Sequence, residues 1–170
     1  MKIRFALITL TMSFFVFAQT TNANLNKTLK EYRQAMLAGK YESLADYIYP
    51  KVFSNFGGKQ NVLMMLKLAG EKTKQQGIHI KSIAHKHAGK MAIKDSEIQI
   101  PIKETTIVES TKDKKRYPTE LLVIAISEDQ GKTWKFINTM NQSKEQLLKF
   151  FPNLSPDLEI KSMDYLKHAR

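Results

Sequence analysis

The sequence contains no cysteine among its 170 residues, a single tryptophan, and only five prolines and seven glycines. The lack of cysteine excludes disulfide bridges, thiol catalysis, iron–sulfur clusters, cysteine-ligated zinc and a lipidated N-terminal cysteine. Hydrophobic residues make up 42% of the chain and charged residues 25%, which is the balance of an ordinary globular protein. Wholesale disorder is therefore excluded.

Several motifs that define enzyme classes are also absent. The sequence has no G-x-S-x-G, no H-E-x-x-H and no paired-carboxylate motif. Gly57 and Gly58 precede a predicted helix, but the lysine and hydroxyl pair of a Walker phosphate loop does not follow them. No cofactor is predicted, and no catalytic residue can be assigned from a motif.

The first 18 residues have the three-part layout of a signal peptide. Lys2 and Arg4 precede an uncharged apolar run over residues 5–17, and Ala18 and Gln19 flank the predicted cleavage point. The alternative is a membrane anchor, but the run is shorter than the ~20 apolar residues that a spanning helix needs. The segment resembles bacterial export signals. We expect an exported protein, periplasmic or secreted, with no transmembrane segment in the mature chain.

Residues 19–152 are predicted to form one domain, followed by a C-terminal tail over residues 153–170. Apolar residues at helical spacing predict helices over residues 24–38, 41–49 and 58–76. Gly39 closes the first helix, Pro50 ends the second and Gly77 caps the third. A short helix over residues 143–151 begins at the cap residue Ser143.

Between the helices predicted over residues 58–76 and 143–151, apolar residues recur at the two-residue spacing that is typical of strands. Residues 78–88 predict a strand with a bulge where the alternation slips, and shorter strands follow near residues 91–93 and over 134–138. Pro101 lies in the strand over residues 98–108 and marks an edge or a kink, because it has no backbone donor. Residues 121–126 are apolar on both faces, which predicts a central strand. In the tail, Leu158, Ile160 and Leu166 are available for docking.

The predicted order of elements defines an α+β fold. N-terminal helices pack on a curved, cone-like antiparallel sheet of four to five strands, and a short helix follows. This layout resembles the nuclear-transport-factor-two-like (NTF2-like) or cystatin-like superfamily. The resemblance implies a pocket at the open end of the cone and a homodimer formed through the sheets. That superfamily includes isomerases, dehydratases and binding modules, but Tyr32, Asp46 and Tyr47 match no catalytic motif of it.

Two histidines are candidate metal ligands. His85 and His87 are two residues apart, so on a strand they share a face and can approach one ion. His79 lies on the same predicted strand, but because of the expected bulge the sequence does not determine which face of the sheet it shares. The neighbouring lysines Lys81 and Lys86 repel cations, which favours a solvated strand edge over a metal site.

The chain is strongly basic, and its densest basic run lies in one predicted loop. Lysine and arginine number 27 against 16 acidic residues, so the formal charge is +11, and +9 once the leader is removed with Lys2 and Arg4. A loop over residues 111–116 concentrates Lys112, Lys114, Lys115 and Arg116. It is a candidate contact for anionic lipid or polysaccharide, although a solvated hairpin tip is the simpler interpretation. Aromatic stacking platforms are lacking, which disfavours nucleic acid.

Residues 127–134 match the S-x-D-x-G-x-T-W pattern of the Asp box found in sialidase-like propellers. Propellers repeat this box in successive blades, whereas this chain has one copy. The pattern therefore predicts a hairpin in which Asp129 and Gly131 form the turn and Trp134 packs behind it.

Three functions remain open from the sequence. The first is a non-catalytic exported domain that binds a small apolar ligand in a cone pocket or binds a protein partner. The second is an isomerase- or dehydratase-like enzyme with a buried Asp, His or Tyr. The third is a basic module that docks on anionic envelope polymers. We favour the first because no catalytic constellation can be identified.

Overall fold

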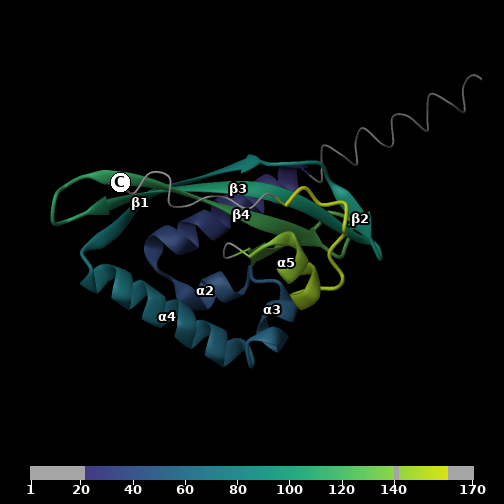
Figure 1. Cartoon of the computed structure of the whole chain (residues 1–170), viewed down its shortest axis with the longest axis horizontal. Coiled ribbons are helices and arrows are strands. Elements are labelled where there is room, and N and C mark those ends of the chain that lie inside the picture. The colour runs from purple at the N-terminus through teal and green to yellow at the C-terminus, as the bar shows by residue number, and fades with distance from the viewer. Residues whose placement is uncertain (1–21, 140–141, 161–170) are drawn as a thin grey trace, which may run out of the picture.

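The computed structural model describes residues 22–139 and 142–160, and it has the predicted α+β architecture. Figure 1 shows the helices gathered beside an antiparallel sheet. The helices are a first helix over residues 22–38, α2 (Tyr41–Ala45), α3 (Pro50–Asn55), α4 (Lys59–Gln75) and α5 (Lys144–Phe150). The strands are β1 (Ile78–His87), β2 (Ala92–Lys94), β3 (Glu97–Ser110), β4 (Arg116–Ser127) and β5 (Lys135–Asn138).

The predicted leader and Leu166 lie outside the described residues. Within the described ranges, no helix combines the length and the apolar character that crossing a bilayer requires.

The sheet has the order β1-β3-β4-β5, with every neighbouring pair antiparallel, and β2 pairs with β3 beyond the end of β1. Pro101 therefore lies in a central strand. Its carbonyl accepts from the N–H of Ala88 at 2.9 Å, so its nitrogen faces the interval where β1 has ended and β2 has not begun. The backbone N–H that proline lacks would therefore point to a gap between β1 and β2 in the hydrogen-bond ladder of β3, which explains why proline is tolerated there.

Alternation divides the core between the two faces of the sheet. One face carries the even-numbered residues of β3, such as Ile100, and packs on the first helix through Leu25 and Leu29. The other face carries Ile124 and Ile126 of β4 and is covered by α5 and the segment after it. Residues 122–127 of β4 are buried throughout, which confirms the predicted central strand.

The predicted bulge in β1 is present. Ile80 pairs with Val108 and Ser82 pairs with Ile107, so Lys81 is the extra residue between them. Because of the extra residue, the side chains before the bulge point to the opposite face of the sheet from the one that regular alternation would give them. His79, paired with Glu109, consequently lies on the other face of the sheet from His85, paired with Glu104.

The predicted helix over residues 41–49 is wrong in extent. The α2 helix stops at Ala45, and a separate helix, α3, begins at Pro50. Pro50 occupies the first turn of α3, where a missing N–H costs nothing and a fixed φ favours the helix. Between the two helices, Tyr49 donates its N–H to the carbonyl of Phe136, which ties this connection to β5.

The C-terminal segment packs on the sheet as far as the described residues extend. Ser143 and Gln146 form a reciprocal capping box at the start of α5, as the predicted cap requires. Leu158 is fully buried, and Ile160 packs against the same core.

Candidate functional site

A buried pair of polar side chains, His85 and Glu104, is the candidate site. The register of β1 and β3 places these two residues directly opposite each other. His85 Nε2 lies 2.9 Å from Glu104 Oε2, and the two side chains are only 5% and 1% exposed. Polar groups so buried lie in a medium of low effective dielectric, where charge and hydrogen bonding have large effects.

Alternation brings Glu104 into this position. Ile98, Ile100 and Ile102 point to the face that packs on the first helix, and Glu104 is the next residue in that series. Its neighbour on β4 is Leu121, so the carboxylate sits on an apolar face. His85 was predicted as a site residue from the sequence and Glu104 was not, although a charged residue that continues a strict apolar alternation is a readable signal.

Tyr32 of the first helix covers the pair. Its ring centroid lies 6.0 Å from that of His85 and 4.9 Å from that of Phe136. Burial raises the pKa of the Tyr32 hydroxyl well above its ordinary value, and the charge of Glu104 raises it further. Tyr32 therefore remains a neutral phenol, able to donate a hydrogen bond, across the physiological pH range.

The other two residues considered with Tyr32 have different surroundings. The Tyr47 ring packs edge-on against Tyr32, with centroids 6.2 Å apart, and its hydroxyl lies 3.5 Å from Glu31. Asp46 is exposed and pairs with Lys59 at 3.5 Å. Neither residue reaches the buried pair through a contact among the described residues.

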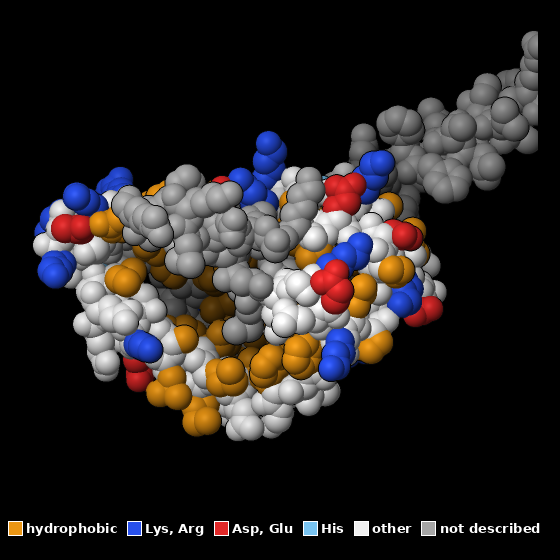
Figure 2. Space-filling model, in the orientation of Figure 1, with side chains coloured by type: hydrophobic (Ala, Val, Ile, Leu, Met, Phe, Trp, Pro, Cys, Tyr) orange, Lys and Arg blue, Asp and Glu red, His pale blue; other side chains and the backbone are white. Residues whose placement is uncertain are grey.

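The molecule is hollowed on this side of the sheet. Figure 2 shows a depression between the sheet and α4, with hydrophobic side chains on its walls and rim. The sheet face that carries His85 and Glu104 is the one turned toward the first helix, and Ile83, Ile102 and Leu121 make it apolar around the pair. A concave, mainly apolar surface with few polar groups is the usual form of a small-molecule site.

The pair can present one defined polar group. When Glu104 is ionised it can only accept, so Nε2 of His85 carries the proton between them. The second ring nitrogen, Nδ1, is then an acceptor in the neutral imidazole and a donor in the charged one. A carboxylate that fixes the tautomer of a histidine in this way is also found in acid–base sites.

The structure puts the metal candidates on one face but shows no metal cluster. His85 and His87 share a face, as predicted, but His87 is exposed whereas the His85 side chain is buried against Glu104. Within residues 22–139 and 142–160, no group of three or more His, Asp or Glu side chains is arranged to hold a metal ion.

The basic run forms the tip of the β3–β4 hairpin, far along the sheet from the buried pair. Lys112, Lys114, Lys115 and Arg116 are all exposed there. Arg116 Nε lies 3.1 Å from Glu109 Oε2, so this guanidinium is partly neutralised.

The Asp-box motif forms the turn between β4 and β5. Asp129 accepts hydrogen bonds from the backbone N–H groups of Lys132 and Thr133 and from the hydroxyls of Ser127 and Thr133. Trp134 is buried behind the turn, only 1% exposed. These contacts match the predicted hairpin, in which the residues of the motif stabilise the turn.

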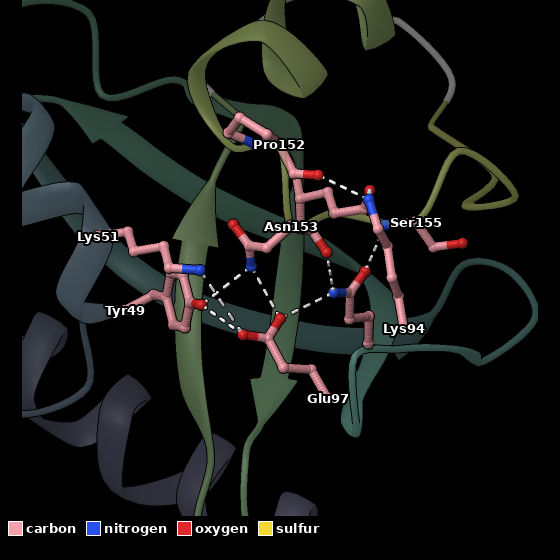
Figure 3. Close-up of polar contacts among 9 residues, drawn as sticks. Tyr49, Lys51, Lys94, Glu97, Pro152, Asn153 and Ser155 are labelled. Carbon is pink, nitrogen blue, oxygen red and sulfur yellow. Dashed lines mark hydrogen bonds and ion pairs between the residues drawn. The ribbon is translucent and has the colours of Figure 1, made fainter.

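A second polar cluster, shown in Figure 3, lies on the opposite face of the sheet. Glu97 Oε1 accepts from the Tyr49 hydroxyl at 2.7 Å, and Oε2 accepts from the side chains of Asn153 and Gln99 at 2.8 and 3.0 Å. Burial, and then the bond to Glu97, raises the pKa of Tyr49. Lys94 Nζ donates to the carbonyl of Pro152 at 2.6 Å. This cluster clamps the C-terminal segment to the sheet, because Asn153 and Ser155 are hydrogen-bonded to Glu97 and Gln99 of β3.

Comparisons with known proteins add little to this description. No protein-family model and no curated protein matches the sequence. Among solved structures, a 2.5 Å structure from Catenulispora acidiphila is similar to this chain, with 14% sequence identity and a TM-score of 0.41. The match covers 70% of this chain and 91% of that chain. The site is therefore interpreted from the residues of this chain.

Proposed function

We propose that this protein is an exported, non-catalytic binding protein for a small, mainly apolar molecule that carries one polar group. The observation that carries the proposal is the buried His85–Glu104 pair on the apolar sheet face that packs on the first helix. The apolar walls would bind the body of the ligand, and the free ring nitrogen of His85 would bind its polar group. Export is supported by the N-terminal leader.

Energetics favour a recognition role for the pair over a stabilising one. Desolvating two ionisable groups costs about as much as their attraction returns, so two apolar side chains would pack as well or better. Polar groups held at such a cost inside a concave site commonly serve binding or catalysis. His85 and Glu104 fit this description, because the apolar side chains of Ile83, Ile102 and Leu121 adjoin them on the same face.

The NTF2-like assignment is part of the same proposal. It is supported by the first helix lying along one face of an antiparallel sheet and by the hollow on that side (Figures 1 and 2). Fold alone does not define a ligand, so the residues of the site carry the functional argument.

The experiment is to recover the protein after expression with its own leader and to record native and denaturing mass spectra. We expect a native mass above the chain mass and release of a small molecule on denaturation. The variant His85→Leu/Glu104→Leu should lose that molecule, because the ligand's polar group loses its partner. The matched control, Lys103→Leu/Glu120→Leu, removes an exposed ion pair from the same hairpin and should retain it. A bare wild-type protein, or equal loss from both variants, contradicts the proposal.

A second candidate function is proton-transfer catalysis of the isomerase or dehydratase type. It is favoured by the 2.9 Å contact between a histidine and a buried carboxylate beside the phenol of Tyr32. Incubating the recovered molecule with the protein in D₂O distinguishes the two functions. After return to H₂O, which restores the exchangeable O–H and N–H protons, binding alone leaves the mass of the molecule unchanged. Acid–base catalysis leaves deuterium on carbon, and Glu104→Gln should slow its incorporation.

A further inference from the structure

The tip of the β3–β4 hairpin and the end of α4 meet at one end of the molecule. The N–H of Thr111 donates to the carbonyl of Gly77 at 2.7 Å, and a Cβ added to Gly77 would lie 2.2 Å from Thr111 Oγ1. Figure 1 shows the hairpin tip and the turn between α4 and β1 at the same end. Two basic segments that are distant in sequence are thereby joined.

Lysines from both segments lie at this end of the molecule, and we call this group the basic end. It consists of Lys72, Lys74, Lys112, Lys114 and Lys115, all of them exposed. Among the residues that the structure describes, none of the five forms an ion pair. Figure 2 shows blue side chains gathered at this end.

The acidic residues nearby do not cancel this charge. Glu109 is occupied by Lys81 at 3.0 Å and by Arg116 at 3.1 Å. Asp113 accepts from the N–H of Lys115 and from the hydroxyl of Tyr117, so it shapes the turn of the tip. With Asp113 and Glu71 counted against the five lysines, the basic end keeps a net charge of +3.

We infer that the basic end docks on the surface of an anionic phospholipid membrane. The lysines project from a loop and a helix end at an extremity of the molecule, a shape suited to a broad flat surface. Ammonium groups suit diffuse negative charge, whereas geometric recognition of single phosphates or sulfates relies on arginine, and Arg116 is engaged by Glu109. This inference is independent of the proposed ligand in the hollow.

The test is co-sedimentation of the full chain with vesicles of phosphatidylcholine, with and without phosphatidylglycerol. We expect binding only to vesicles that contain phosphatidylglycerol, with steep loss as salt is added, because screening weakens exposed charges. The variant Lys74→Glu/Lys112→Glu/Lys115→Glu should bind about a hundredfold more weakly, since each basic residue near an anionic surface contributes several-fold. Lys114 is left unchanged because its φ of 58° makes that position sensitive to substitution.

A matched control changes the same charge elsewhere. Lys90→Glu/Lys132→Glu/Lys149→Glu alters three exposed lysines that lie outside the basic end and should leave vesicle binding within about twofold of wild type. Equal loss in both triple variants would show that only net charge matters and would overturn the inference. Binding to pure phosphatidylcholine, or retention on heparin without binding to vesicles, would also overturn it, the latter in favour of a polyanionic polymer.

Discussion

A double-mutant cycle on His85 and Glu104 tests whether the two side chains act as one buried unit. His85→Leu leaves a carboxylate that is 1% exposed without its partner, and removing one member of a buried pair typically costs about 3–5 kcal/mol. Glu104→Leu leaves a histidine that can stay neutral, so the cost is one buried unsatisfied group, about 1–3 kcal/mol.

The double variant should behave differently from the sum of the singles. Replacing both partners with leucine removes the two desolvation costs together, so its stability should lie within about 2 kcal/mol of wild type. The coupling energy is then at least about 2 kcal/mol, in the upper part of the range for residues in contact. The total stability of a domain this size is about 5–15 kcal/mol, so each single variant should remain folded enough to measure.

The assay is urea unfolding followed by tryptophan fluorescence and circular dichroism. Trp134 is the only tryptophan in the chain and belongs to the core between the sheet and the first helix, so its emission reports unfolding of the core on the face that carries the pair. The control cycle on Lys103 and Glu120, which are 36% and 46% exposed, should give a coupling below about 1 kcal/mol. A His85–Glu104 coupling below about 0.5 kcal/mol would refute the reasoning, because it would mean that water reaches the pair.

Two further predictions concern the basic end. In urea unfolding, Gly77→Ala should destabilise the protein by about 1–3 kcal/mol more than the control Gly39→Ala. The two glycines have similar positive φ angles (70° and 63°), but only at Gly77 would the added Cβ meet Thr111. Equal effects would show that Thr111 moves aside. The hydrogen bond from the Tyr117 hydroxyl, and next the one from the Lys115 N–H, lower the pKa of Asp113 from 3.8 to about 2. The ionised Asp113 therefore stabilises the folded protein at pH values above the pKa of the unfolded chain, and this stabilisation is lost as the pH falls from about 4 to 2. In an NMR titration, Tyr117→Phe should move that pKa back toward 3.8, and an unchanged value would assign the shift to another contact.

Periodicity predicted most of the fold because it reports which face of each element is buried. The stripe that includes Leu25, Leu29 and Tyr32 gave the first helix, and the doubly apolar run around Val123 gave the central strand. Pro50 misled the prediction because proline both ends one helix and begins the next, and only the contact of Tyr49 with β5 decides between them.

The candidate site was half predictable. His85 drew attention through its spacing from His87, but its partner lies across the sheet, and the register depends on where the bulge falls. Glu104 was readable as a charged residue on an apolar face, whereas the meeting of α4 with the hairpin tip depends on the contact between Gly77 and Thr111. Local patterns do not encode such a long-range contact.

The bulged strand β1 also bears on how copies of this chain avoid one another. Among the described residues β3 is its only strand partner, so β1 is an edge strand of the sheet that these residues form, and a second sheet could join there. Lys81 and Lys86 stand along this margin, and the bulge at Lys81 interrupts its regular spacing. Charge and irregularity at a sheet margin discourage edge-to-edge aggregation. We therefore expect part of the chain's basic character to oppose edge-to-edge pairing of its own copies, a role distinct from attracting a partner.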